Sequence, residues 1–502
     1  MISVFDLGPP EACPAPFNMA AHVLGRADAQ PEKPALVVPG QEHWTYGALK
    51  SAVLGTAAGL LDLGAVPGDR VLMRLGNTVD FPLAYLGALA AGLVPVPTAA
   101  GLTAGEVAPM IVALTPRLIL HDPLVACPPD PCCVPLAQLR AMRTLPPAPW
   151  HMGDPERAGY IVYTSGTSGV PRAVVHAHRA IWARRMMHQG WYGLGTQDRM
   201  MHAGAFNWTY TLGTGLMDPW TVGATALIPP AGTAPADLAA LAAAHGATIF
   251  AAAPGVYRQL LAQTSLPAMP ALRHGLSAGE KLPQATAARW HAATGTPVYE
   301  AYGMSECSTF ISASPDRPAD PGTLGRPQHG RRIALLGDDG PVPLGTEGTI
   351  AVHRSDPGLM LGYLDAPEAT AAKMQGAWFV TGDQGRMDAD HQITYLGRRD
   401  DMMNAGGFRV SPLEVEAHLA GLTGITSVGV TEVMVRQDVS VIAAFYTAPA
   451  PLDEAVLRRY AEATMARYKQ PRLYVHLPAL PMGANGKILR RALRQYVEAP
   501  DE

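Results

Sequence analysis

The sequence predicts an α/β protein in which layered α/β subdomains fill most of the chain and a β-rich stretch precedes a last α+β region. Strand-like and helix-like segments alternate from about residue 35 to residue 310, which is typical of layered sheets with mostly parallel strands. Between residues 340 and 395 the pattern changes to short alternating runs, such as GTIAVH and HQITYLG, separated by Gly and Asp turns. These runs indicate a β-rich subdomain.

The first α/β block can be followed element by element. Apolar runs and helical spacing predict, in order, a strand at 35–38, a helix capped by Thr45 that runs to about Leu63, a strand at 70–74, a helix at 83–92 and a strand in the following LVPVP run. Residues 120–155 are rich in Pro, Asp and Cys and are expected to form a loop. A second alternating block covers about 160–310, and the α+β region begins near residue 402.

Composition excludes several classes of protein. A chain of 502 residues suggests two to four domains, and 48% hydrophobic residues provide enough apolar material for large cores, which excludes global disorder. The net charge of −4 gives no electrostatic reason to expect nucleic acid as a partner. Residues 81–105 contain no charged side chain, but Pro82, Pro95 and Pro97 interrupt them. A helix leading into a buried strand is therefore expected there, not a membrane span.

The cysteines and the N-terminus bear on localisation. The five cysteines are sparse and lack metal-type spacing, which favours reduced thiols. The opening MISVFDLGPPEACPAP has neither a basic segment nor an apolar core, so no signal peptide is expected. Together these features predict a cytoplasmic protein.

A phosphate-binding loop is the first functional candidate. The apolar run 160–163 is followed by TSGTSG at 164–169, where glycines let backbone N–H groups converge on an anion and hydroxyls add donors. Neither a G-x-x-x-x-G-K-[ST] motif nor a G-x-G-x-x-G motif is present. Taken alone, the string is also compatible with a flexible Gly/Ser loop.

Four further motifs remove that ambiguity. They are AYGMSE at 301–306, TGD at 381–383, GRRDDMMNAGGFRVSPLEVE at 397–416 and PMGANGKILRR at 481–491. With TSGTSG, their order and spacing resemble the adenylate-forming superfamily, which comprises acyl-CoA synthetases, adenylation domains of peptide synthetases and luciferases. The resemblance covers about residues 18–495. It implies an N-terminal adenylation domain (1–398) with the ATP and acyl pockets, a hinge (399–401) and a small mobile α+β C-terminal domain (402–502).

The resemblance also implies nucleotide-binding roles. The β- and γ-phosphates of ATP would be held by the phosphate loop, which consists of Thr164, Ser165, Gly166, Thr167, Ser168 and Gly169. Glu306, with Thr164, would bind Mg²⁺, which prefers carboxylate and phosphate oxygens. The purine pocket would be formed by Ser277, Gly279, Glu280, Ala301, Tyr302 and Gly303. Asp383 would accept hydrogen bonds from the ribose, with Arg398 reaching the ribose or phosphates and Arg409 the ATP or its product.

The catalytic lysine and the hinge follow from the same resemblance. Lys487 would bridge the carboxylate and the α-phosphate, a task suited to a compact ammonium on a flexible stem. Only six of the 38 basic residues are lysines, which adds weight to a lysine at this motif position. Asp400 would be the pivot, and Gly406 and Gly407 would line the thiol tunnel. Two positions depart from many relatives: Arg172 and Asn404 stand where lysine is frequent.

The acyl pocket is expected from the segments around these motifs. The resemblance implies a wall formed by Phe206, Trp208, Tyr210, Ala252, Ser277, Met304 and Ser305. The aromatic residues at 206, 208 and 210 are spaced by two, so a buried strand face is an equal alternative. No charged residue occurs at 202–215, which favours a monocarboxylate because an unpaired buried charge is costly.

The substrates expected are a carboxylic acid, ATP and coenzyme A. The FNMAAHVL, VGATALI and SAGEKLP segments most resemble benzoate-type CoA ligases, which implies an aryl or compact cyclic acid first and a short or branched aliphatic acid second. A stand-alone enzyme loading a carrier protein and a non-catalytic nucleotide-binding scaffold are the alternatives. The oligomeric state stays open, with a homodimer among the options.

Overall fold

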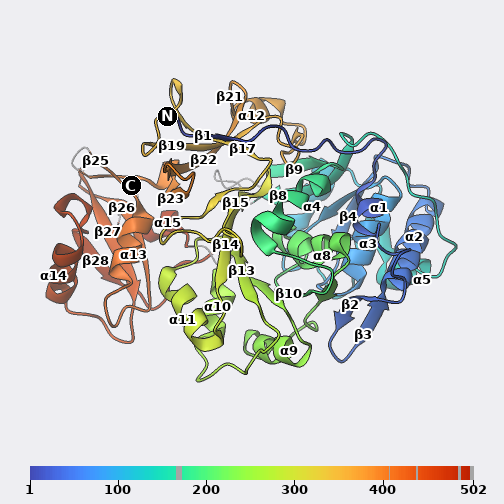
Figure 1. The fold of residues 1–502 in the computed structure, drawn as a ribbon, viewed down its shortest axis with the longest axis horizontal. Helices are drawn as coiled ribbons and strands as arrows, with labels where there is room; N and C mark the ends of the chain where they lie inside the picture. Colours follow the sequence, from blue (N-terminus) through green and yellow to red (C-terminus); the bar gives the residue numbers. More distant parts are fainter. Residues whose placement is uncertain (165–171, 406–407, 437–438, 484–487, 498–502) are drawn as a thin grey trace. The chain divides into compact units, whose positions relative to one another are not determined.

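The computed structural model describes residues 1–164, 172–405, 408–436, 439–483 and 488–497. The chain divides into two compact units (Figure 1). Unit 1 comprises Met1–Val4, Ala334–Ala351 and Val380–Glu502, and unit 2 comprises Phe5–Ile333 and Val352–Phe379. The predicted boundary at residues 399–401 stays a prediction. The mixed α/β architecture predicted from the alternating segments is confirmed.

A nine-stranded sheet forms the centre of unit 2 (Figure 1). Its strands, in spatial order, are β16 (Arg326–Pro327), β15 (Ser308–Ser312), β14 (Val298–Met304), β13 (His274–Ala278), β12 (Ile249–Ala252), β10 (Arg199–Ala203), β11 (Thr225–Leu227), β2 (Pro34–Val38) and β3 (Glu42–Thr45). From β14 to β2 all neighbours are parallel. The carboxyl ends of these strands therefore meet at one edge, where ligands commonly bind in α/β sheets.

Two smaller sheets complete the strands of the N-terminal part. A parallel sheet contains β5 (Val94–Pro97), β4 (Arg70–Arg74), β6 (Leu118–His121) and β7 (Cys133–Pro135). An antiparallel sheet contains β20 (Gly362–Tyr363), β9 (Arg172–Ala177) and β8 (Ala158–Thr164). The second sheet matters for function because β8 and β9 flank the TSGTSG loop.

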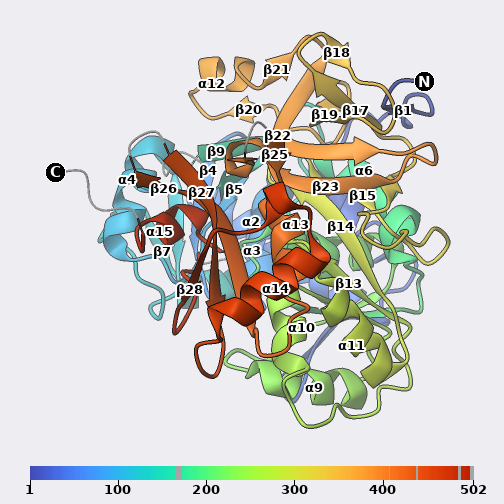
Figure 2. The ribbon, with the colours of Figure 1, turned by 90° about the vertical axis from the view of Figure 1, so that its left-hand side faces the viewer.

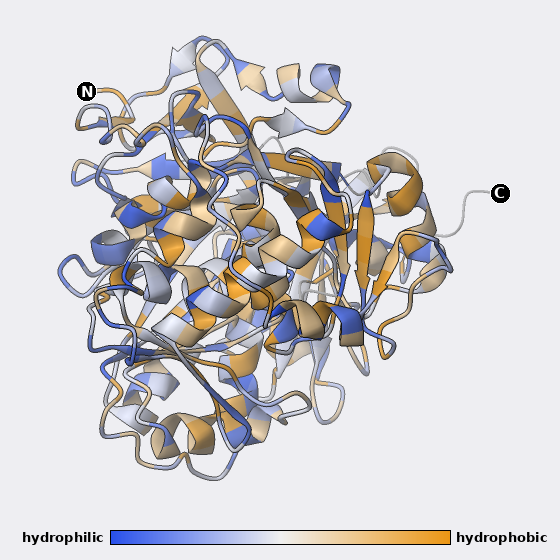
Figure 3. Cartoon of the chain, turned by 90° about the vertical axis from the view of Figure 1, so that its right-hand side faces the viewer, coloured by the Kyte–Doolittle hydropathy of each residue, from blue (hydrophilic) through white to orange (hydrophobic). Residues whose placement is uncertain are grey.

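The helices of unit 2 cover these sheets. They are α1 (Met19–Val23), α2 (Tyr46–Asp62), α3 (Asp80–Ala90), α4 (Ala104–Leu114), α5 (Leu136–Met142), α6 (Ala180–Ala183), α7 (Arg185–Met187), η1 (His188–Tyr192), η2 (Tyr210–Met217), α8 (Asp218–Val222), η3 (Pro235–Asp237), α9 (Leu238–Ala244), α10 (Pro254–Leu260), α11 (Gln284–Thr294) and α12 (Pro367–Ala371). Apolar residues concentrate on the packed strands and inner helix faces, as the orange segments of Figure 3 show.

Local sequence rules explain the first helices. Thr45 caps α2 as predicted, because its hydroxyl accepts a hydrogen bond from the Ala48 backbone N–H at 3.2 Å. Helix α3 begins at Asp80, earlier than the predicted residue 83, because Pro82 falls in the first turn, where its missing N–H costs nothing. Helix α3 and strand β5 confirm the expected helix and strand of residues 81–105. In the described part of the chain, no helix is long and apolar enough to cross a membrane.

The prediction of a loop at 120–155 is wrong in part, because β7 and α5 lie there. Helix α5 forms because Leu139 and Met142 can bury themselves against α2. A Cβ atom at Gly59 of α2 would lie 2.3 Å from the Met142 side chain. The close approach therefore depends on a glycine in another helix, which local composition does not reveal.

Unit 1 carries the C-terminal α+β structure (Figure 2). Its complete elements are β18 (Gly340–Pro341), β23 (Ile393–Arg398), η4 (Arg399–Asp401), β24 (Met403–Ala405), β25 (Phe408–Val410), α13 (Pro412–Leu419), β26 (Ser427–Arg436), β27 (Val439–Thr447), α14 (Glu454–Thr464), η5 (Arg467–Lys469), β28 (Leu473–His476) and α15 (Arg490–Arg494). Helix α13 starts at Pro412 after the N-cap Ser411. Strands β26, β27 and β28 form one sheet.

The predicted β-rich stretch at 340–395 is confirmed. Its strands are β19 (Glu347–His353), β21 (Met374–Gln375) and β22 (Trp378–Met387), with β18, β20 and β23. Strand β1 (Val4–Asp6) and strand β17 (Arg332–Gly337) are the remaining strands. Within unit 1, β22 and β23 are antiparallel neighbours, and Asp383 faces Arg398 in their register.

Candidate active site

Strands β8 and β9 form an antiparallel pair on either side of the predicted phosphate loop. Thr164 ends β8 and is the register partner of Arg172, which begins β9. The loop residues Ser165, Gly166, Thr167, Ser168 and Gly169 lie outside the described residues. The ends of these strands therefore place Thr164, which carries a hydroxyl, and Arg172, which carries a guanidinium, opposite each other on the two sides of the loop.

Glu306, the predicted magnesium ligand, lies just after β14 and is 9% exposed. The hydroxyl of Tyr363 donates a hydrogen bond to its Oε1 at 2.7 Å, and the Arg172 guanidinium lies 5.1 Å from the centre of the Tyr363 ring. Because Tyr363 pairs with Val174 of β9, one small sheet holds Arg172, Tyr363 and the loop ends. No sequence pattern singles out Tyr363, since an isolated GY dipeptide is not distinctive.

The oxygens around Glu306 suit a hard cation. A carboxylate and the Thr164 hydroxyl are the ligand types that Mg²⁺ accepts, together with phosphate oxygens. In the described ranges, no group of three or more His, Cys, Asp or Glu side chains could hold a metal ion. The residue types of Thr164 and Glu306 fit a Mg²⁺ ion that also binds phosphate oxygens.

The predicted purine-pocket residues gather at the carboxyl ends of β13 and β14. Ser277 is fully buried and pairs in register with Ala252 and Glu300, while Ala278 pairs with Ala301. Tyr302 packs edge-on against Phe310, with ring centres 5.3 Å apart. Gly303 is required as glycine because a Cβ there would lie 2.1 Å from the Ser308 carbonyl oxygen. Gly279 and Glu280 follow the end of β13, and Gly279 has a φ of +95°, which favours glycine.

The three aromatic residues predicted for the acyl-pocket wall, at positions 206, 208 and 210, do not lie on one common surface. Strand β10 ends at Ala203 and η2 begins at Tyr210, so the alternative of a buried strand at 206–210 is wrong. Phe206 packs against Phe81, with ring centres 5.8 Å apart. Tyr210 turns the other way and donates a hydrogen bond to the Leu276 carbonyl at 3.1 Å. Trp208 is half-buried between them.

Two glycines allow η2 to lie close to its neighbours. A Cβ at Gly213 would lie 2.3 Å from the Arg184 guanidinium carbon, and one at Gly215 would lie 2.7 Å from the His202 side chain. These contacts pack η2 tightly on its neighbours. Met304 and Ser305, the last predicted wall residues, are half-buried at the end of β14, where the Ser305 carbonyl lies 2.7 Å from His176 Nε2.

Glu300 is a further residue of this sheet edge that sequence reasoning missed. Its Oε1 accepts a hydrogen bond from the Leu282 backbone N–H at 2.8 Å, which ties the segment after Glu280 to β14. Burial raises the pKa of Glu300 from 4.5 to about 7. A glutamate within a strand is usually exposed, so the sequence contained no signal for this placement.

Replacing Glu300 with glutamine is expected to stabilise the protein at high pH only. Between pH 4.5 and 7 the unfolded chain loses the proton that folded Glu300 retains, so stability falls as pH rises through this window. Glutamine does not ionise, so this loss of stability with rising pH disappears, and its side-chain oxygen still accepts the hydrogen bond from the Leu282 backbone N–H. We expect Glu300→Gln to raise the free energy of unfolding by about 2–3 kcal/mol at pH 8 and to leave it unchanged at pH 4.5, measured by urea unfolding. Equal shifts at both pH values would contradict this assignment.

Unit 1 contains the remaining functional candidates. Arg398 Nε lies 3.2 Å from Asp383 Oδ1, and burial, reinforced by Asp383, raises the pKa of Tyr395. Asp400 lies in η4 and Arg409 on β25. The predicted tunnel glycines Gly406 and Gly407 and the predicted catalytic Lys487 lie outside the described residues.

Arg490, three positions after Lys487, anchors the end of this motif. Its Nη2 lies 2.8 and 2.9 Å from the two Glu416 carboxylate oxygens, and its Nη1 lies 3.7 Å from Asp401 Oδ2. Arg490 therefore ties the start of α15 to helix α13 and to the predicted hinge. The sequence motif contained this arginine, but its carboxylate partners come from segments about 75–90 residues away.

Comparison with known proteins identifies the class. The family model described as AMP-binding enzyme matches residues 25–364, and the protein belongs to this family of adenylate-forming enzymes. The 3-hydroxybenzoate–CoA ligase of Aromatoleum sp. (strain CIB) is 28% identical over 515 residues, covering 96% of this chain and 97% of that protein.

Two solved structures share the fold. The anthranilate CoA ligase AuaEII in complex with anthranoyl-AMP matches with a TM-score of 0.87 and 25% identity, covering 97% of this chain and 98% of that chain. A benzoate CoA ligase from Burkholderia xenovorans LB400 matches with a TM-score of 0.85 and 27% identity, covering 95% of this chain and 100% of that chain. The resemblance to benzoate-type CoA ligases predicted from sequence is thereby confirmed.

Proposed function

We propose that this protein is an AMP-forming acid–CoA ligase that converts an aromatic or compact cyclic monocarboxylate, ATP and CoA into acyl-CoA, AMP and pyrophosphate. The observation that carries the proposal is a chain of contacts at the predicted phosphate loop. Thr164 and Arg172 are register partners on the two strands that flank the loop, and Tyr363 contacts both Arg172 and Glu306. Relatives named as benzoate-type CoA ligases support the aromatic acid and the CoA acceptor.

In the first half-reaction, an oxygen of the acid's carboxylate attacks the α-phosphorus of ATP. A bond forms between that oxygen and the phosphorus while the bond to the pyrophosphate oxygen breaks, which yields acyl-AMP and pyrophosphate. Negative charge accumulates on the phosphate oxygens in the transition state, so fixed positive charge and hydrogen-bond donors lower the barrier. We assign these roles to Lys487, the loop 164–169 and Arg172.

Glu306 and Thr164 would hold Mg²⁺, which would neutralise phosphate charge. The Tyr363 hydroxyl donates a hydrogen bond to Oε1 of Glu306. This contact fixes the orientation of the carboxylate and leaves Oε2 for the ion. At the nucleotide's other end, Ser277, Gly279, Glu280, Ala301, Tyr302 and Gly303 would bind the purine, while Asp383, Arg398 and Arg409 would bind the ribose and phosphates.

In the second half-reaction, the CoA thiolate attacks the carbonyl carbon of acyl-AMP and AMP leaves. Rotation of residues 402–502 about Asp400 would withdraw Lys487 and bring Gly406 and Gly407 to the thiol's path. Such domain rotations allow one pocket to serve two steps. We further propose a cytoplasmic location, supported by the five free cysteines, because reduced thiols are typical of that compartment.

The test is ATP- and CoA-dependent pyrophosphate release across benzoate, substituted benzoates, cyclohexane carboxylate and aliphatic acids from C2 to C8. We expect an aromatic or cyclic acid to give the highest kcat/KM. A preference for an aliphatic acid would contradict the proposed substrate class. Acyl-AMP formation without thioester formation would contradict CoA as the acceptor and indicate a carrier protein.

Replacing Tyr363 with phenylalanine is expected to weaken the magnesium dependence of adenylation. The variant loses the hydrogen bond that orients Glu306, and losses of about 10–100-fold are typical for such supporting contacts. We expect pyrophosphate release to fall in that range and the half-saturating Mg²⁺ concentration to rise. Tyr46→Phe is the matched control, because among the described residues this buried phenol bonds only the Trp220 and Ala224 carbonyls. An unchanged Mg²⁺ titration in Tyr363→Phe would refute the orienting role.

A further inference from the structure

Asn77 is an exposed residue outside the five sequence motifs, and its side chain joins two segments that lie far apart in the sequence. Its Oδ1 accepts a hydrogen bond from the Phe206 backbone N–H at 2.8 Å, and its Nδ2 donates one to the Gly204 carbonyl at 3.2 Å. A backbone N–H can only donate and a carbonyl can only accept, so these partners fix the orientation of the carboxamide. The side chain therefore holds the peptide groups on both sides of Ala205, as a neighbouring β-strand would.

The turn that carries Asn77 is a rigid support. It follows β4 and precedes α3, and Val79 within it is only 3% exposed. Asp80, the first residue of α3, forms ion pairs with Arg140 and Arg143. Because the turn is packed and its end is held by charge, the Asn77 carboxamide is a fixed attachment point for the segment that it binds.

The segment held by Asn77 is the turn that leads to Trp208. Within this turn, the Trp208 backbone N–H donates a hydrogen bond to the Ala205 carbonyl at 3.1 Å. On its other side the turn packs against η2, since a Cβ atom at Gly204 would lie 2.4 Å from Thr211 Oγ1. The turn is therefore held from two sides, and its position determines where the Trp208 side chain lies.

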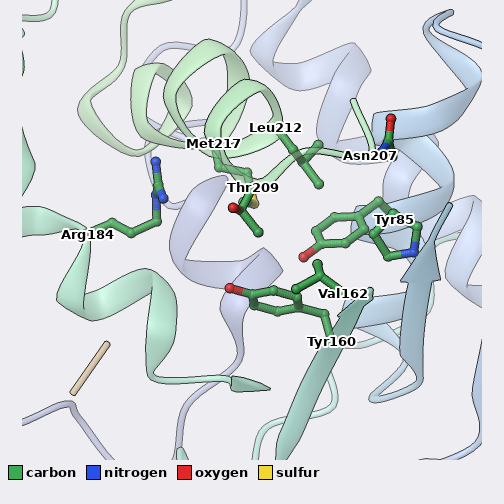
Figure 4. A pocket seen from close by; sticks show the side chains of 9 residues that line it. Tyr85, Tyr160, Val162, Arg184, Asn207, Thr209, Leu212 and Met217 are labelled. Atoms are coloured by element: carbon green, nitrogen blue, oxygen red, sulfur yellow. The ribbon is translucent and has the colours of Figure 1, made fainter. Parts of the chain in front are cut away.

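Helix α3 packs along the same segment. The ring of Phe81 lies 5.8 Å from the ring of Phe206, measured between their centres. Both segments also line the small cavity shown in Figure 4, with Tyr85, Asn207, Thr209 and Leu212. These side-chain contacts hold the two segments together, whereas the hydrogen bonds of Asn77 fix the backbone of the turn itself.

The turn lies at the sheet edge that carries the predicted nucleotide and acyl residues. Ala203, the last residue of β10, is the register partner of Ala252, which is in turn the partner of Ser277. Neighbouring strands lie about 4.8 Å apart, so Ser277 is about 10 Å from Ala203, and the turn begins at the next residue. A shift of the turn would therefore move the predicted wall residues at 206 and 208 relative to this row.

We propose that Asn77 is a positioning residue for the acid: its two hydrogen bonds hold the turn 204–208, and with it Trp208, at the edge where the acid meets ATP. The inference rests on the proposed function, because that function assigns this turn to the acyl pocket. In this role Asn77 acts through the backbone of the turn and not through contact with a substrate. Its loss is expected to affect the acid and not ATP, whose predicted binding residues lie in other segments.

The test measures kcat and the KM values for the acid and for ATP in the wild type and in Asn77→Ala, with the acid of the proposed panel that gives the wild type its highest kcat/KM. Asn77→Ala is expected to lower kcat/KM for the acid about 10- to 100-fold, since a displacement of about 1 Å can cost about 100-fold. The loss should arise mainly from a higher KM for the acid, with the KM for ATP unchanged. Asn77→Asp keeps an acceptor for the Phe206 N–H and should lose less than Asn77→Ala.

Gln263→Ala is the matched control. This carboxamide also donates to the carbonyl of a distant residue, Ala236, at 3.0 Å, but it lies outside every predicted binding segment. Gln263→Ala should leave kcat and both KM values unchanged. An unchanged KM for ATP in Asn77→Ala shows that this variant retains its fold.

The two possible failures are distinguishable. If the wild type activates an acid, but Asn77→Ala leaves the KM for that acid unchanged or raises the KM for ATP by the same factor, the inference is overturned while the proposed function stands. If no acid of the panel releases pyrophosphate in the wild type, the proposed function fails and the inference fails with it.

Discussion

Lys487→Ala is expected to abolish adenylation while sparing thioester formation from supplied acyl-AMP. The lysine ammonium would offset charge on the carboxylate and the α-phosphate only while the phosphorus is attacked. We expect acyl-AMP synthesis to fall by about 10³-fold or more, as is common when a charge-stabilising group is removed. Pyrophosphate release measures the first half-reaction, and acyl-CoA formation from synthetic acyl-AMP measures the second.

Lys373→Ala provides the matched control for this experiment. Lys373 is one of only six lysines in the chain and lies outside every motif assigned to the nucleotide. It should leave both half-reactions unchanged. A proportional loss of both half-reactions in Lys487→Ala would indicate a structural role for the lysine and contradict its assignment to adenylation.

Asp218→Asn is expected to cause the largest loss of stability among the variants considered. Burial would raise the pKa of Asp218, but the Arg184 guanidinium, together with His188, outweighs that effect and holds the pKa below its usual range. Removing the carboxylate charge leaves the Arg184 cation buried and unbalanced. Such losses cost about 3–5 kcal/mol, and urea unfolding monitored by tryptophan fluorescence should report them, because Trp191 and Trp220 are buried in unit 2.

Two further variants sharpen this measurement. Asp6→Asn removes the charge from the exposed pair with Arg332, whose side chains are 33% and 31% exposed, and should cost less than about 1 kcal/mol. The double variant Arg184→Met/Asp218→Leu removes both charges and should recover much of the stability lost in Asp218→Asn. A loss in Asp218→Asn no larger than in Asp6→Asn would show that the buried charge is compensated by other groups.

Local sequence determined much of the fold because its signals act over a few residues. The cap at Thr45, the strand at 70–74 and the start of α13 after Ser411 follow from hydrogen bonds and dihedral preferences within one turn. Helix α5 was missed because its stability comes from contact with α2 at Gly59. The alternative of a buried strand at 206–210 is wrong because alternating aromatic residues are compatible with any buried surface, and Phe206 and Tyr210 pack in different clusters.

The site residues fall into the same two groups, those found by local sequence motifs and those found only in the folded chain. Sequence motifs located Thr164, Glu306, Asp383 and Lys487, because a phosphate loop, a metal-binding carboxylate and a motif lysine need particular residue types in particular local patterns. Their partners were not predictable. Tyr363 reaches Glu306 across 57 positions, and Arg490 reaches Glu416 across 74. Only the folded chain brings such pairs together.

The sequence by itself therefore determined the family, the order of the motifs and the chemistry of adenylation. The tertiary structure decided which residues from distant segments pack together. Tyr85, Tyr160 and Arg184 lie in three separate segments, and no local pattern distinguishes them from other core residues. They meet in one cavity because α3, β8 and the turn after α6 pack together. Such long-range contacts depend on how separate segments pack, which is why motifs could predict the class of reaction while only the packed core shows which side chains meet.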